Sequence, residues 1–154
     1  MATVVQELLD HGADLDLQAN NGNTALINAC FYNRKATASQ LIQRGANVNL
    51  QSKNGEFALY RASRNGMATV VQELLDHGAD LNLQNNDGNT ALHVAAQFNA
   101  VVVVTELLKV QGINIHARNN EGKTALEIAR GNNYPEIVEL LQSQAGRFTK
   151  PARG

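Results

Sequence analysis

Short apolar stripes at helical spacing recur along the chain, and a glycine follows each of the longer ones. In residues 67–84 the apolar positions that share one helix face are Val70, Val71, Leu74 and Leu75. Gly78 follows this stripe and suits the left-handed position that ends many helices. A shorter stripe begins after Thr90, a residue type that favours the N-cap. The pattern predicts pairs of short helices with a tight turn before each pair.

The tight turns recur at a fixed period. Their glycines are Gly22, Gly55, Gly88 and Gly122, at spacings of 33, 33 and 34 residues. Residues 1–18 and 67–84 differ only where Asp16 stands in place of Asn82. A period of this length is typical of a repeat architecture, in which each unit buries its apolar face against its neighbours.

Each repeat is predicted to contain a hairpin, a short helix, a turn, a longer helix and a glycine turn. Because residues 1–18 match the second half of another unit, we expect them to form a half repeat containing a helix and an arm. Three full repeats follow, at 19–51, 52–84 and 85–118. Residues 119–146 form a C-terminal capping repeat, with its last helix at about 135–143, and 147–154 form a flexible basic tail. We call these full repeats units two to four and the cap unit five.

Composition and charge narrow the function classes. The chain of 154 residues is 44% hydrophobic but only 5% aromatic, without tryptophan, which suits a stack of small helices. Its net charge of −1 predicts no general attraction to nucleic acid or to an anionic membrane. Without an apolar leader or a long apolar run, we expect a cytoplasmic protein. A specialised secretion system would leave no mark that could be read here.

The repeats resemble the ankyrin repeat family. Unit four carries Thr90-Ala91-Leu92-His93-Val94-Ala95-Ala96, and unit three ends in Gly78-Ala79-Asp80-Leu81-Asn82. The resemblance covers about residues 1–145 and implies an all-α, ankyrin-like helical solenoid of helix-turn-helix units joined by β-hairpin-like loops. Unit three departs from the pattern, with Phe57 and Tyr60 where the family has Thr and His. Its first helix therefore lacks the usual cap, which typically costs about 1 kcal/mol.

Candidate chemistry in the sequence is sparse. His93 has no companion ligand at metal spacing, and the resemblance implies a structural histidine near Thr90 that bridges neighbouring hairpins. Cys30, the only cysteine, is expected to be a buried and inert thiol. The glycine turns lack the spacing of a phosphate-binding loop. We therefore predict a protein that is not an enzyme, with no metal or cofactor.

The resemblance places the partner-binding surface on the hairpin tips and the exposed side of the first helices. Carried over by position, the candidate residues are Asn23, Phe31, Tyr32, Lys53, Glu56, Arg64, Asn89, Gln97, Phe98 and Lys123. Three of these are aromatic, and exposed aromatics near an arginine are typical of a binding hot spot. The alternative is that the aromatic rings pack against the adjacent helix turn.

Charge gives a second, weaker indication. Residues 31–66 contain six basic residues and one acidic residue, a local charge of +5, which leaves −6 for the rest of the chain. An acidic partner segment could dock there, or the charges could be a scattered, solvated set. Arg34, Lys35 and Arg44 are expected to lie away from the concave face.

These observations predict a non-catalytic protein-protein interaction module that presents a concave groove to a protein partner. One alternative is a structural or self-associating scaffold, part of a longer array, that uses the open N-terminal end. There the apolar residues of the helix at 3–10 would be partly exposed: Val4, Val5, Leu8 and Leu9. Another is a targeting domain of a larger effector or enzyme. We expect a monomer, in the cytoplasm or in a host cytoplasm if the protein is a bacterial effector.

Overall fold

The computed structural model describes residues 14–149, with side chains up to Gln144. This part of the chain contains helices and turns but no strand. The helices of units two and three are α2 (Ala25–Phe31), α3 (Lys35–Gln43), α4 (Ala58–Arg64) and α5 (Ala68–Asp76). Those of units four and five are α6 (Ala91–Gln97), α7 (Val101–Leu108), α8 (Ala125–Gly131) and α9 (Pro135–Thr149).

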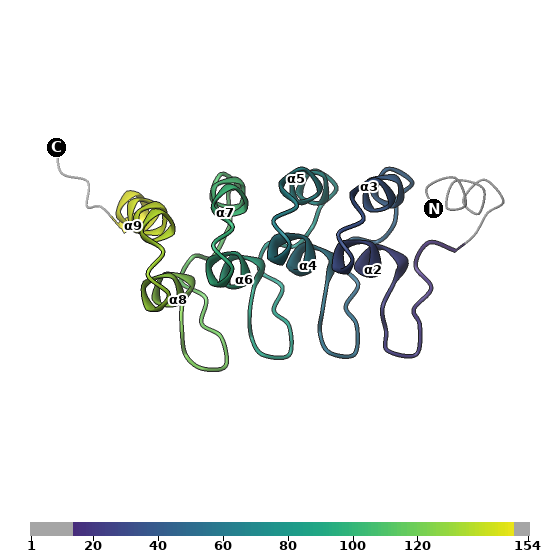
Figure 1. The fold of residues 1–154 in the computed structure, drawn as a ribbon, viewed down its shortest axis with the longest axis horizontal. Coiled ribbons are helices and arrows are strands. Elements are labelled where there is room, and N and C mark those ends of the chain that lie inside the picture. Colours follow the sequence, from purple (N-terminus) through teal and green to yellow (C-terminus); the bar gives the residue numbers. More distant parts are fainter. Residues whose placement is uncertain (1–13, 150–154) are drawn as a thin grey trace.

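The helices form two parallel rows, and a hairpin loop precedes each first helix (Figure 1). The first helices α2, α4, α6 and α8 pack side by side in one row, and α3, α5, α7 and α9 pack in the other. The hairpins all project from the first row, away from the second. This arrangement confirms the predicted all-α solenoid of helix-turn-helix units.

Threonine caps begin most of the first helices. The Thr24 hydroxyl accepts the amide of Ile27 at 3.1 Å, and Thr90 and Thr124 each form a capping box. The α4 helix has no side-chain cap, as predicted, because Phe57 stands at this position. Phe57 is 1% exposed. Unit three therefore replaces a capping hydroxyl with buried aromatic packing.

The core runs along the solenoid between the two helix rows. Each full repeat contributes one buried leucine from its first helix: Leu26, Leu59 and Leu92. The second helices contribute Ile42, Leu74 and Leu107, each fully buried. Val70 and Val71 are also buried, whereas Leu75 is only half-buried, so the predicted helix face is correct. Removing such a side chain would leave a cavity shared by two repeats.

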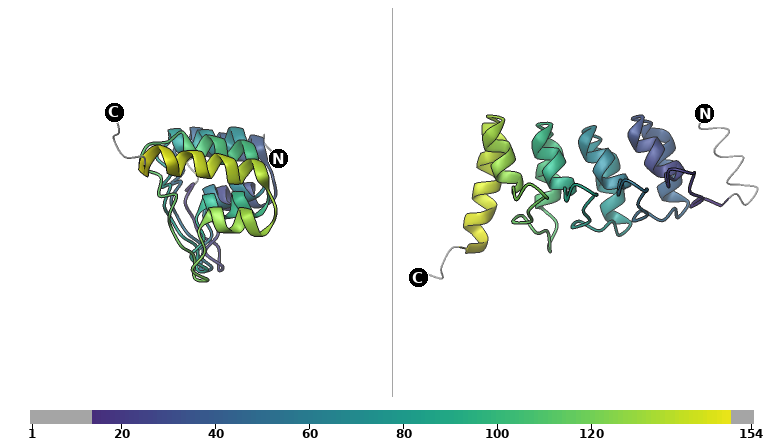
Figure 2. Two further views of the ribbon diagram at one scale, coloured as in Figure 1. Left: turned by 90° about the vertical axis from the view of Figure 1, so that its left-hand side faces the viewer. Right: turned by 90° about the horizontal axis from the view of Figure 1, so that it is seen from below.

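One glutamine per repeat ties each hairpin to the next. The side-chain amide of Gln18 donates to the Gly22 carbonyl at 2.8 Å and to the Gln51 carbonyl, in the next repeat, at 3.0 Å. Gln51 and Gln84 repeat this pattern. At the next equivalent position the glutamine is replaced by Arg118, whose guanidinium donates to the Gly122 carbonyl of its own hairpin. The hairpins therefore keep a common orientation along the solenoid and overlap in end view (Figure 2).

The C-terminal end differs from the sequence prediction. The α9 helix runs to Thr149 instead of ending near residue 143, so residues 147–149 of the predicted flexible tail are helical. No proline interrupts the chain between Pro135 and Pro151, and a proline disfavours helix in the residue before it. The predicted helix at residues 3–10, with its apolar residues, and residues 150–154 of the tail lie outside the described residues.

Candidate partner-binding groove

The hairpins and the first helices together line one face of the solenoid, which we call the concave groove. Three clefts lie along it. The N-terminal cleft, of about 260 Å³, lies between units two and three, and the central cleft, of about 400 Å³, is lined by units three to five. The C-terminal cleft, of about 260 Å³, lies between units four and five. The groove is therefore formed by neighbouring repeats together.

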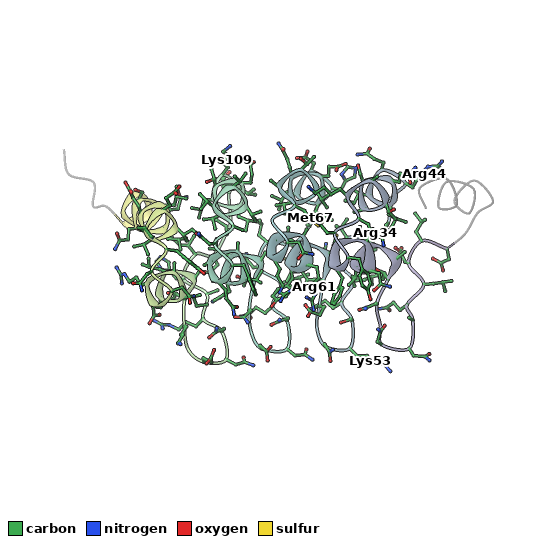
Figure 3. All side chains as sticks on the ribbon, in the orientation of Figure 1. Arg34, Arg44, Lys53, Arg61, Met67 and Lys109 are labelled. Atoms are coloured by element: carbon green, nitrogen blue, oxygen red, sulfur yellow. The ribbon has the colours of Figure 1, made fainter. Side chains whose placement is uncertain are left out.

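Nine of the ten candidate residues line these clefts. The N-terminal cleft contains Asn23, Phe31, Tyr32 and Glu56. The central cleft contains Arg64, Asn89, Gln97 and Phe98, and the C-terminal cleft contains Lys123 and again Asn89 and Gln97. Lys53 lines none of them and lies at a hairpin tip (Figure 3).

The three candidate aromatics are exposed. Phe31 is 42% exposed, Tyr32 64% and Phe98 45%. Phe31 and Tyr32 meet edge to face, with their ring centroids 4.9 Å apart. Exposure in the groove, instead of burial against the next helix turn, makes these rings available to a ligand.

Arg61 belongs to this surface, although sequence reasoning counted it only as a charge. Its guanidinium carbon lies 4.3 Å from the Phe31 ring centroid, and the same guanidinium pairs with the Glu56 carboxylate. Burial raises the pKa of the Glu56 carboxyl, and the nearby Arg61 charge counteracts this effect. Arg61 and Phe31 come from different repeats, so no local pattern in the sequence joins them.

Arg64 makes a similar cation–π contact with the repeat on the other side of α4. Its guanidinium carbon lies 4.5 Å from the ring centroid of Phe98, in unit four. The two arginines of α4 therefore stack on aromatic rings of the two neighbouring repeats. Each such cation–π contact contributes about 0.5–1 kcal/mol at an exposed site. The predicted proximity of an exposed aromatic to Arg64 is confirmed for Phe98.

The basic segment at residues 31–66 does not form one patch. Arg44 lies on the helix row far from the hairpins, whereas Lys53 lies at a hairpin tip and Arg61 between them (Figure 3). Neither Arg34, Lys35 nor Arg44 lines a cleft of the groove, as predicted. The scattered distribution agrees with the solvated alternative.

His93 has a structural role. Its Nδ1 accepts the backbone amide of Thr90 at 3.1 Å, and its Nε2 donates to the Lys123 carbonyl, in the next hairpin, at 2.9 Å. A carbonyl only accepts, so Nε2 carries the proton and the ring is neutral. Burial lowers the pKa of the imidazole, which keeps this form. The predicted bridge between hairpins is confirmed.

The surroundings of Cys30 do not favour a reactive thiol. Cys30 is fully buried, and burial raises the pKa of its thiol to about 12. At neutral pH the thiolate that a nucleophile requires is therefore scarce. Within residues 14–149, no group of three or more His, Cys, Asp or Glu side chains could hold a metal ion.

None of the helices in the described part of the chain is long and apolar enough to cross a membrane.

Comparison with known proteins identifies the repeat. A family model described as ankyrin repeats (3 copies) matches residues 1–85 and residues 59–150. No curated protein matches the sequence. The two matched ranges overlap and together cover nearly the whole chain.

Proposed function

Because the chain belongs to the ankyrin repeat family, we propose that it is a non-catalytic module that binds a protein partner in its concave groove. Ankyrin repeats generally mediate protein–protein interaction, and solenoids of this kind use extended concave surfaces. The observation that carries the proposal is the row of exposed aromatics in the groove, Phe31, Tyr32 and Phe98, with an arginine stacked on two of them.

The chemistry of this row suits a protein ligand. Aromatic and arginine side chains are enriched among residues that dominate the energy of protein interfaces. The clefts beside them are mainly polar and carry several asparagine side chains, which can pair with a peptide backbone.

The mode of binding is rigid display. Gln18, Gln51 and Gln84 join consecutive hairpins, and His93 joins two more elements across a repeat boundary. These bonds fix the spacing of the groove residues before a partner arrives. We expect small backbone movement on binding and a correspondingly small ordering cost.

The proposal is tested by capture of partners from lysate with quantitative mass spectrometry. The bait variant carries Phe31→Ala, Tyr32→Ala and Phe98→Ala together. The matched control is Val102→Ala, since Val102 is 61% exposed on α7 and lines no cleft of the groove. Far-UV circular dichroism checks that both variants keep their helices.

We expect the triple variant to lose at least one protein that the wild type and the Val102→Ala control both capture. Equal capture by all three baits would contradict binding in the groove. Loss of helicity in the triple variant would show that the rings belong to the core, which would also overturn the surface assignment.

A further inference from the structure

The two arginines stacked along the groove differ in their charge balance. Arg61 is neutralised by Glu56. The Arg64 guanidinium makes no hydrogen bond or ion pair to the described chain; it stacks on the Phe98 ring and lies near enough to the Glu56 carboxylate to lower the pKa of that group. Stacking on the ring favours one position of the guanidinium and leaves its N–H donors unpaired. Arg64 is therefore a preorganised cation at the edge of the central cleft.

The hairpins on the other side of the central cleft carry the opposite charge. Asp87 comes from the hairpin of unit four and Glu121 from the hairpin of unit five, and both line the cleft with Arg64. Both residues are exposed, and neither carboxylate pairs with another described side chain. Arg64 and the two carboxylates therefore line about 400 Å³ of open space with no ion pair between them.

Charge complementarity selects among ligands for this space. A ligand with only acidic groups would pair with Arg64 but would be repelled by Asp87 and Glu121. A ligand with only basic groups would be repelled by Arg64. A ligand with both charges, in the right order, satisfies all three groups. Gln97 also lines the cleft, and its side-chain amide makes no hydrogen bond to the described chain. Its donor and acceptor are available to a peptide backbone.

We propose that the central cleft binds an extended peptide segment of the partner that carries an acidic residue and a basic residue. The acidic residue pairs with Arg64, and the basic residue pairs with Asp87 and Glu121. On one face of an extended chain such residues stand about 7 Å apart, so one short segment can supply both. This assignment rests on the proposed function of the groove and specifies which kind of segment it recognises.

The test is selection of random peptides displayed on phage against the immobilised full chain. The baits are the wild type, Arg64→Glu, and the double variant Asp87→Lys with Glu121→Lys. Arg34→Glu is the matched control, because Arg34 is exposed but lines no cleft of the groove. Dissociation constants of selected synthetic peptides are then measured by fluorescence anisotropy.

We expect wild type and Arg34→Glu to select peptides with an acidic residue close to a basic one. Arg64→Glu should weaken their binding by about tenfold or more, and exchange of the peptide's acidic residue for lysine should restore affinity for that variant. The double variant should select against the basic residue instead.

Peptides without this charge pair, or peptides insensitive to the Arg64→Glu change, would overturn the inference, and so would a failure to select any peptide. The proposed function is decided separately. If the triple aromatic variant still loses a captured partner while no charged peptide is selected, the groove binds its partner by other means.

Discussion

Gly88 lies directly against Asn120 of the following hairpin. A Cβ atom on Gly88 would stand 2.7 Å from the backbone nitrogen of Asn120, closer than real Cβ contacts allow. Gly22 and Gly55 have the same relationship to their following hairpins. Gly122 does not, because a Cβ there would meet nothing within 4 Å. The glycine of each internal hairpin is therefore required by its neighbour as well as by its own turn.

This relationship predicts unequal effects of two similar substitutions. Gly88 and Gly122 both have positive φ, 78° and 75°, so alanine strains both turns alike. Only Gly88→Ala also collides with a neighbouring backbone. We expect it to lower the free energy of unfolding by about 1–3 kcal/mol more than Gly122→Ala does. Urea denaturation measures both values, and equal losses would contradict the stacking.

The sequence period predicted most of this fold. The glycine spacing placed the hairpins, and Thr90 marked a helix start that the structure confirms. The left-handed residues of the turns inside the repeats were not predicted: Asn33 and Asn99 adopt positive φ there, as Gly66 does in unit three. Asparagine is so frequent in this chain that its presence alone does not distinguish a left-handed position from an ordinary turn.

The candidate site was predicted less completely. The exposed aromatics followed from their position in the repeat. The stacking of Arg61 on Phe31 and of Arg64 on Phe98 could not be predicted, because these pairs depend on the distance between neighbouring repeats. The helix end at Thr149 was missed because the basic residues that follow residue 146 were interpreted as a flexible tail.

Asp16 offers a stabilising substitution. Its carboxylate accepts the backbone amide of Asn47 at 2.8 Å. One repeat on, Asn49 makes the same bond to Asp80 and also donates to the Gly78 carbonyl at 3.1 Å, which an aspartate cannot do. We expect Asp16→Asn to raise the free energy of unfolding by about 0.5–1.5 kcal/mol in urea denaturation.

The reciprocal change is the control. Asn82 makes both bonds, accepting the amide of Asn114 and donating to the Gly112 carbonyl. Asn82→Asp should therefore destabilise the protein by a similar amount. If Asp16→Asn were neutral while Asn82→Asp destabilised, the second bond would not form at the N-terminal end.

Ser63 is a buried hydroxyl without a partner. It is 0% exposed, and its Oγ makes no hydrogen bond. The equivalent positions in units two and four are Cys30 and Ala96. A thiol is only a weak hydrogen-bond donor and a methyl group is none, so neither side chain needs a buried partner. We expect Ser63→Ala to raise the free energy of unfolding by about 1 kcal/mol. Ser39→Ala, which removes a hydroxyl bonded to Glu73 at 2.6 Å, should lower it in the same urea assay.

His93 predicts a loss of stability in mild acid. Burial lowers the pKa of its imidazole in the folded state, so the unfolded chain binds more protons between that lowered pKa and the ordinary value of about 6.5. Stability therefore falls as the pH drops through about 6.5 and levels off below the folded pKa. Protonation of Nδ1 also removes its bond from the Thr90 amide.

Thermal unfolding between about pH 7.5 and pH 5 measures this dependence. We expect His93→Gln to reduce the slope, because it removes the buried imidazole. A slope that survives His93→Gln would assign the effect to other groups.

The central claim is that a protein partner binds in the concave groove, and site-specific photocrosslinking tests it most directly. A photoreactive phenylalanine analogue is placed at Gln97, which lines the central and C-terminal clefts, or at Val102, which is exposed on α7 outside them. The account predicts a covalent adduct with a partner protein from position 97 and none from position 102. Adducts from position 102 alone, or equally from both positions, would contradict it.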